Sequence, residues 1–382
     1  MHTLTQTANY IWQRANWPAW RMDMSALITP LEKASKAQGN LLGRLHDLGM
    51  DERNLASVAA LTSDVVKSNE IEGERLNEHS VRSSIARRLG VDVGALAPED
   101  RSVEGVVDML LDATQKYDQP LSKERLFAWH IALFPHNPYR LREIQVGQWR
   151  TDATGPMQVV SGRINHERIH YEAPPAARLD AEIDAFLVWV NQEDAAIPDL
   201  LRAGLGHLWF VTIHPFDDGN GRIARAIDDM LLARADRTTQ RFYSLSAQIM
   251  RQREEYYEIL ERTQKGDMDV TEWLVWFLQA LEASIKHAHL ALDKVLAKAK
   301  FWQTYSDLVL NARQKKVLNK VLDGTFEGKL TNKKWQALAN ASPDTALRDI
   351  TELVKHGVLT PQGAGRGTHY LLCVSADSQK SP

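Results

Sequence analysis

Twelve consecutive residues, His214 to Arg225 (HPFDDGNGRIAR), constrain the fold most strongly, because they require one helix to end, a tight loop to follow and a second helix to begin. Pro215 disfavours helical angles at His214, so the first helix must end there. The two glycines of the run permit tight backbone angles and the close approach of a ligand. Apolar residues recur at helical spacing on both sides of the loop: Leu205, Leu208 and Val211 before it, and Ile223, Ile227, Met230 and Leu231 after it. We expect the second helix to begin near Arg222.

The same run contains the groups that would hold a polyphosphate beside a base. The start of a helix presents free N–H groups and a partial positive charge to an anion. Arg222 and Arg225 lie three residues apart, on one helix face, where they could grip successive phosphates. Asp218 would repel phosphate unless a cation intervened, and Mg²⁺ naturally bridges carboxylate and phosphate oxygens. His214, neutral near pH 7, could remove a proton from an attacking hydroxyl.

Each of these residues has an ordinary structural explanation when it is taken alone. A histidine after a helix can serve in packing, a Gly-Asn-Gly sequence in a turn, and an arginine pair on a solvated face. No structural need calls for all of them in one continuous run. The sequence therefore predicts a nucleotide site with its own general base.

The composition of the chain is that of a globular protein with two or three domains: 382 residues, 44% hydrophobic and 25% charged. Its one cysteine, Cys373, cannot form an internal disulfide, and no Cys/His cluster has the spacing of a zinc site. A reducing compartment, the cytoplasm, is the simplest interpretation. No signal peptide is visible at the start, and no apolar run is long enough to cross a bilayer, so we expect no membrane association.

Helical periodicity dominates the chain and predicts a mainly α fold. Residues 1–95 form a helical N-terminal region that opens with three tryptophans, which we interpret as a small core or inter-domain packing. Residues 96–290 form the central domain. The one convincing β signal within it is a hairpin over Pro156–Ala173, with strands at Met157–Val160 and Arg168–Tyr171 around a turn at Gly162.

The C-terminal part, residues 300–373, differs from the rest in charge. From Asn311 to Leu372 there are ten Lys or Arg against five Asp or Glu, about +5, whereas the whole chain carries −3. Three short helices are expected there, at Asn311–Gly324, Thr331–Asn340 and Ser342–His356, followed by strands at Gly357–Thr360 and Thr368–Cys373. We expect Leu347, Ile350 and Val354 to form the buried stripe of the third helix. This pattern resembles a winged helix.

At every fixed position the twelve-residue run is identical to HPFxDGNGRxxR, the signature of the Fic (filamentation induced by cAMP) family, which this chain therefore resembles. The resemblance implies a helical fold whose members mostly transfer AMP from ATP to a protein hydroxyl, with pyrophosphate leaving. It also implies a role for each residue of the run. His214 is the base, Phe216 anchors the loop, Asp218 binds magnesium, Asn220 with the loop amides of Gly219 and Gly221 stabilises the attacked phosphate, and Arg222 and Arg225 hold the outer phosphates.

Two further segments match the family. The hairpin at 156–173 occupies the place of the family's flap, which pairs with an extended segment of the target protein, and Val160 and Gly162 match positions beside the nucleotide. The pair Tyr256-Tyr257 resembles a helix near the adenine, with Tyr256 as the nucleotide-binding residue. Gln264 stands where some relatives carry Asn.

Ser68 to Gly73 (SNEIEG) resembles the inhibitory pattern of one subgroup, in which Glu72 would pair with Arg225. An Arg225 held by a carboxylate cannot grip the γ-phosphate, and a tenfold attenuation requires only about 1.4 kcal/mol. The same glutamate could instead align a water that removes AMP from a modified protein.

The resulting interpretation is a Mg²⁺-dependent, self-inhibited protein adenylyltransferase that uses ATP and modifies a Ser, Thr or Tyr hydroxyl. Removal of AMP and transfer of another nucleotide remain as alternatives, and so does a DNA-binding regulator in which the Fic core senses a nucleotide. The winged helix could bind DNA or protein, and the chain could form a homodimer.

Overall fold

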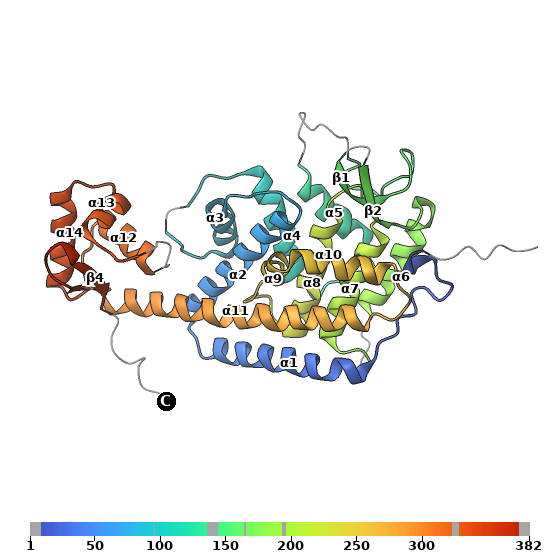
Figure 1. The fold of residues 1–382 in the computed structure, drawn as a ribbon, viewed down its shortest axis with the longest axis horizontal. Helices are drawn as coiled ribbons and strands as arrows, with labels where there is room; N and C mark the ends of the chain where they lie inside the picture. The colour runs from blue at the N-terminus through green and yellow to red at the C-terminus, as the bar shows by residue number, and fades with distance from the viewer. Residues whose placement is uncertain are drawn as a thin grey trace, which may run out of the picture. The chain divides into compact units, whose positions relative to one another are not determined.

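The computed structural model describes residues 9–94, 96–135, 144–163, 166–192, 196–322 and 328–373. The chain divides into two compact units, Met1–His289 and Leu290–Pro382. Helices dominate both units, and the strands form only two-stranded hairpins (Figure 1). The prediction of a mainly α fold is therefore confirmed.

The first unit begins with a short 3-10 helix and three α-helices: η1 Ile11–Gln13, α1 Met24–His46, α2 Met50–Ile71 and α3 Glu78–Leu89. Side-chain caps explain two of the starts, because Asp23 accepts from the N–H of Ser25 and Asn77 from that of Ser80. The apolar residues of α2 at helical spacing predict one buried face: Val58, Leu61 and Val65 are buried, and Leu55 is half-buried.

The N-terminal tryptophans pack as a small core, as the sequence indicates. Trp12 forms a cluster with Tyr171 and Ala173 of the hairpin segment. Trp17 and Trp20 contact each other edge-on, with ring centroids 5.0 Å apart, and both contact Trp209 of the central helices. The N-terminal segment thus supports the hairpin and α7 together.

The rest of the first unit contains the helices that position the motif. These are α4 Arg101–Gln115, α5 Lys123–Leu133, α6 Leu179–Asn191, α7 Asp199–Ile213, α8 Asn220–Asp236, α9 Leu245–Arg251 and α10 Arg253–Gln264, with η2 Ala176–Arg178 before α6. Helix α11, Thr271–Thr304, begins in this unit and continues past His289 into the second. Residues Leu200 to Ile213 of α7 are all buried. Helix α8 begins two residues earlier than expected, because the left-handed Gly219 (φ 81°) already ends the loop.

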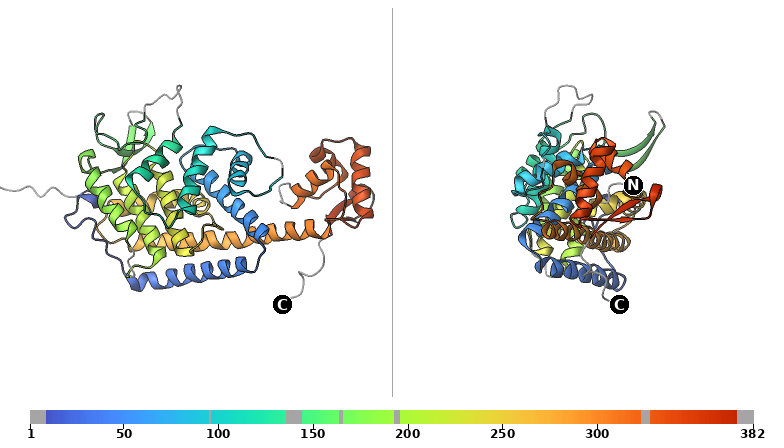
Figure 2. Two further views of the ribbon diagram at one scale, coloured as in Figure 1. Left: turned by 180° about the vertical axis from the view of Figure 1, so that it is seen from behind. Right: turned by 90° about the vertical axis from the view of Figure 1, so that its left-hand side faces the viewer.

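The expected hairpin is present as β1 Gln158–Arg163 and β2 His166–Glu172, which pair antiparallel with an irregularity between Val159 and Val160. It projects from the surface of the first unit (Figure 2). The turn expected at Gly162 is displaced, because Gly162 (φ 111°) lies inside β1 opposite Glu167. The connection between the strands lies outside the described residues.

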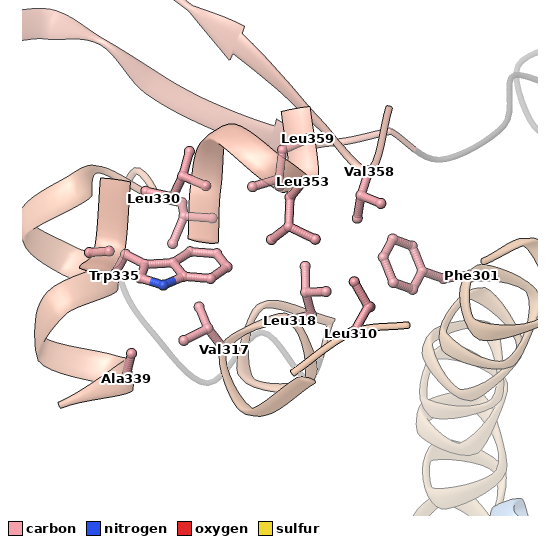
Figure 3. Close-up of a cluster of buried hydrophobic side chains, with 12 residues drawn as sticks. Phe301, Leu310, Val317, Leu318, Leu330, Trp335, Ala339, Leu353, Val358 and Leu359 are labelled. Carbon is pink, nitrogen blue, oxygen red and sulfur yellow. The ribbon is translucent and has the colours of Figure 1, made fainter. Parts of the chain in front are cut away.

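The second unit contains α12 Ala312–Leu322, α13 Asn332–Ala339, α14 Pro343–Lys355, η3 Gly365–Gly367 and the hairpin of β3 Leu359–Gln362 with β4 His369–Leu372. Thr331 and Ser342 cap their helices with their side chains, and Pro343 occupies the first turn of α14. A core of aliphatic side chains surrounds the buried Trp335 (Figure 3).

One expectation for this unit is wrong. Ile350 is buried and Val354 is half-buried against the core, as expected, but Leu347 is 49% exposed. Ala346 and Leu353 are buried in its place. The apolar period of α14 is satisfied by either of two neighbouring faces, and the small Ala346 fits against the core where a leucine was expected.

Within the described residues, no helix is long and apolar enough to cross a membrane.

Candidate nucleotide and transfer site

His214 ends α7 in the left-handed conformation (φ 51°, ψ 57°), its N–H still donating to the carbonyl of Phe210. Its Nδ1 lies 3.2 Å from the carbonyl oxygen of Val211. Because a carbonyl only accepts, Nδ1 carries the proton and the lone pair is on Nε2. Burial and the charge of Arg150 lower the pKa of His214 to about 4. The imidazole is therefore neutral near pH 7, as a general base must be.

The loop after His214 is anchored in the core by Phe216, which is fully buried. Its ring stacks on His130 with centroids 4.1 Å apart. Asn220 closes the loop with two hydrogen bonds, since its Oδ1 accepts from the N–H of Phe216 and its Nδ2 donates to the carbonyl of the same residue. In this structure the Asn220 side chain shapes the loop, which leaves the backbone N–H groups at the start of α8 as the donors that could bind an anion.

Glycines shape the start of α8. Gly219 is the N-cap and offers no side-chain hydrogen bond to the helix, so the first amides of α8 keep their donors for a ligand. A Cβ on Gly219 would lie 3.0 Å from the Phe134 ring, and its φ of 81° disfavours any other residue. A Cβ on Gly221 would collide with the carboxylate of Glu72. The space beside Gly221 is thus occupied by Glu72.

Asp218 is the residue that fits a magnesium ion. Its side chain is 56% exposed, with Oδ1 accepting from the N–H of Gly219 at 2.6 Å. Among the described residues no cluster of three or more His, Cys, Asp or Glu could hold a metal by itself. One exposed carboxylate is the kind of ligand that Mg²⁺ takes when substrate phosphates and water complete its coordination.

Arg225 is 2% exposed and held by the end of α2. Its Nη2 lies 2.8 Å from Oε1 of Glu72 and donates also to the carbonyl of Ser68, while Nε donates to Oγ of Ser68. Its remaining nitrogen, Nη1, finds no hydrogen-bond partner in the described part of the chain. The pair expected between Glu72 and Arg225 is present, and Ser68 reinforces it.

Arg222 is held in the same way by a residue that the sequence did not single out. Its Nη1 lies 2.7 Å from Oε2 of Glu74, and its guanidinium lies over the ring of Phe134 at 5.0 Å. Gly73 (φ 84°) turns the chain back at the end of α2, so that the N–H of Glu74 donates to the carbonyl of Asn69. Both arginines of the motif are therefore paired with carboxylates of one short segment.

The charges of the site favour this ionised arrangement. Burial alone would raise the pKa of Glu72, but Arg225, with smaller contributions from Arg222 and His214, holds that pKa below its usual value. Burial likewise acts to lower the pKa of Arg225, and the charge of Glu72 outweighs it. The pair is thus fully ionised at neutral pH.

The hairpin is anchored to the helices at its base and presents an apolar pair farther out. The hydroxyl of Tyr171 donates to the carbonyl of Thr212 at 2.6 Å, and Glu261 of α10 accepts from Arg168 and pairs with His170. Val160 and Ile169 are register partners, 45% and 44% exposed. Their exposure leaves this part of the strand pair open to a ligand or a partner segment.

Tyr256 has a packing role in this structure. It is 2% exposed, and its hydroxyl lies 2.8 Å from Nε2 of His207, whose Nδ1 lies 2.6 Å from Asp228. Tyr257 is more exposed and lies against Arg253. Gln264 is buried and donates to Thr212. The buried His207–Asp228 pair carries no sequence signal, because its partners come from separate helices.

Two known families match separate parts of the first unit. Residues 120–232 match the Fic/DOC family, and residues 10–91 match a family described as a domain of unknown function (DUF4172). The first match includes the hairpin, α7 and most of α8, and the second includes the Glu72 segment.

Curated relatives share the name protein adenylyltransferase Fic. The protein of Nematostella vectensis is 32% identical over 120 residues, covering 30% of this chain and 26% of the relative. That of Drosophila mojavensis is 23% identical over 224 residues, covering 58% and 36%, and that of Culex quinquefasciatus is 26% identical over 222 residues, covering 56% and 39%. The matches thus span roughly a quarter to two fifths of the length of these relatives.

Two solved structures have the same fold. A Fic family protein from Desulfovibrio desulfuricans superposes with a TM-score of 0.54 at 17% identity, covering 94% of this chain and 99% of that one. A Fic domain containing signaling protein from Bacteroides thetaiotaomicron gives a TM-score of 0.51 at 18% identity, covering 70% and 97%. These likenesses establish the helical Fic fold.

Proposed function

We propose that this chain, which belongs to the Fic/DOC family through residues 120–232, is a protein adenylyltransferase that transfers AMP from ATP to a hydroxyl of a target protein. The observation that carries the proposal is the position of His214. Its neutral imidazole, with the lone pair on Nε2, stands at the loop that leads into the open start of α8. A base beside an anion site is the arrangement that nucleotidyl transfer to a hydroxyl requires.

Each residue of the site has a defined task in this reaction. The loop amides and the start of α8 bind the α-phosphate and stabilise the charge that develops there. Arg222 and Arg225 bind the outer phosphates, and His214 takes the proton of the acceptor hydroxyl through Nε2. Magnesium bound to Asp218 would neutralise phosphate charge. The target segment lies along the hairpin, where added strand pairing orients the hydroxyl with little demand on the target sequence.

The proposal includes a brake formed by Glu72 and Glu74. Both arginines must leave these carboxylates before they can bind outer phosphates. Charge-assisted hydrogen bonds contribute roughly 1.5–3 kcal/mol each, so the Glu72–Arg225 pair is sufficient for an attenuation of tenfold or more. Glu74 is 50% exposed against 30% for Glu72, so it should contribute less.

Labelling with ATP tests the proposal. Wild type and Glu72→Gly are incubated with ATP labelled on the α-phosphate or on the γ-phosphate, alone and with cell lysate. We expect α-label, and no γ-label, to enter protein at least about tenfold faster with Glu72→Gly. Glu74→Gln should raise the rate by about twofold to threefold, as expected for a half-exposed pair.

Three outcomes would change the proposal. Retention of γ-label would indicate phosphoryl transfer, and faster labelling from GTP, UTP or CTP would indicate another nucleotide. Loss of label from a previously modified protein, dependent on Glu72, would indicate AMP removal. Failure of Glu72→Gly to label any protein with all four nucleotides would reject transferase activity.

For the second unit we propose a winged-helix domain that does not bind duplex DNA tightly through α14. Arg348 and Lys355 on this helix are opposed by Asp344 and Glu352, and all four line one hollow of its surface. Affinity for duplex DNA depends on an excess of positive charge. A salt-dependent mobility shift with random duplex DNA at micromolar protein would contradict this expectation.

A further inference from the structure

Arg150 is a fully buried arginine that none of the motifs includes. Its side chain has 0% exposure, and it lies between α5 and the hairpin in the chain. Its Nε donates to the carbonyl of His214 at 2.7 Å, and its backbone N–H donates to the carbonyl of Pro215 at 2.9 Å. One residue thus binds two consecutive carbonyls of the turn that carries the base.

The other arm of the guanidinium reaches the hairpin. Nη2 of Arg150 donates to the carbonyl of Pro174, just after β2, at 2.5 Å. Nη1 lies 3.1 Å from Oδ1 of Asp152, whose Oδ2 accepts from the N–H of Ala176. The planar fork of an arginine has donors in several fixed directions, which a lysine lacks. Arg150 therefore ties the end of the hairpin to the turn at His214.

The turn needs such support because His214 is a non-glycine residue in the left-handed region. Residues in sparsely populated backbone regions are destabilising by themselves and persist only where the surrounding contacts hold them in place. The bond from Arg150 holds the His214 carbonyl in the direction that this conformation requires. The direction of the imidazole follows from the same backbone angles.

We propose that Arg150 is a positioning residue for the transfer reaction. It holds His214 at a fixed position relative to the hairpin on which the target segment lies. The proposal rests on the function proposed above. It explains why a charge is buried here at all, since a hydrophobic residue could fill the space without joining the two segments. A misplacement of about 1 Å at a reacting group costs on the order of 100-fold in rate.

The charge of Arg150 has a second effect on the base. Among the described residues, the charged groups that shift the pKa of His214 include Arg150 from the segment before the hairpin, Glu72 from the end of α2, and Asp218 from the loop. Burial and Arg150 lower the pKa of His214, while Glu72 and Asp218 raise it. Removing the charge at position 150 should therefore raise the pKa of the imidazole toward its ordinary value of about 6.5.

Two substitutions separate position from charge in the Glu72→Gly background. Arg150→Lys keeps a positive charge but loses the fork, so kcat should fall by about 10- to 100-fold, with KM for ATP unchanged within about twofold and the acid limb of the pH profile in place. Arg150→Gln loses both the positive charge and the fork. Its kcat should therefore fall by a similar factor, and the acid limb of its pH profile of kcat should move up toward pH 6.5.

Arg234→Gln is the matched control. Arg234 also donates to two backbone carbonyls, those of Tyr117 and Val190, but it lies in the last turn of α8, far from the base. We expect its kcat and pH profile to be unchanged even if its thermal stability falls. An equal loss of kcat in this control, or kcat within twofold of the parent for both Arg150 variants, would overturn the proposal.

A readout independent of activity separates this inference from the proposed function. In histidine-labelled full-length protein, the NMR titration of His214, assigned by its loss in His214→Ala, should show a higher pKa in Arg150→Gln than in wild type. If Glu72→Gly labels nothing, the proposed transfer fails and this titration alone decides whether Arg150 controls the imidazole. An unchanged His214 titration then rejects the inference.

Discussion

The turn from α7 to α8 and the turn from α13 to α14 both begin with a left-handed residue that is not glycine, and they use it differently. His214 joins α7 to α8 at φ 51° and ψ 57°, and Asn340 joins α13 to α14 at φ 51° and ψ 54°. After Asn340, the start of α14 is closed by Ser342, which accepts from the N–H of Thr345, and by Pro343, which has no N–H. After His214, the start of α8 has neither device.

The difference shows how one backbone shape serves two purposes. Asparagine tolerates the left-handed region because its side chain bonds locally, so the turn at α14 is structural. Where histidine occupies the same angles and the next helix lacks a cap, the orphan N–H groups are available for a ligand. In the first unit the space beside Gly221 is taken by Glu72, an internal carboxylate.

The largest expected effect is the loss of the base. His214→Ala in the Glu72→Gly background should lower the rate of AMP transfer by about 10²–10⁴-fold, because general base catalysis contributes that much. Asn340→Ala, the matched change at the other turn, should leave the rate unchanged. Rates are measured with α-labelled ATP. An equal loss of rate in both variants would contradict the proposal that only the turn at His214 serves the reaction.

The pH dependence of the brake gives a smaller effect. The pKa of Glu72 lies below its usual value, so the stabilisation from its pair with Arg225 is fully present above about pH 4.3, the ordinary glutamate pKa. It is lost only as the pH falls through the lowered value. The ratio of Glu72→Gly to wild-type transfer rates should therefore stay constant from pH 8 to about pH 5. A ratio that approaches one near pH 6 would contradict the ion pair.

The smallest effect is expected from a substitution at the capped start of α14. Ser342→Ala removes the cap of α14 and should cost about 1 kcal/mol, with no change in transfer rate. Hydrogen exchange of the α14 amides would detect this loss of local stability as about fivefold faster exchange. Slower transfer in this variant would mean that the second unit contributes to the reaction.

The sequence predicts what depends on neighbouring residues. Pro215 and the glycines determine where α7 ends, and Ser342 with Pro343 determines where α14 begins, and both boundaries are found within about two residues. Such signals are local backbone preferences, which tertiary packing rarely overrides at a capped end or before a proline.

What the sequence did not reveal depends on long-range geometry. Arg150 reaches His214 across 64 residues. Glu74 meets Arg222 only because Gly73 turns the chain back over Asn69. Whether Leu347 is exposed depends on which side of α14 packs against Trp335 and its neighbours. Periodicity alone does not decide between adjacent faces of the helix.

Glu72 is the C-terminal cap of α2, and this position bears on how the proposed transfer activity could be switched on. The final turn of a helix opens and closes far more readily than the domain that contains it. Unwinding that one turn would withdraw Glu72 and Glu74 together, and it would also displace Ser68, Asn69 and Ile71, which are buried. Activation would then be a local opening of one helix end, and any partner that captured the unwound segment would prolong it.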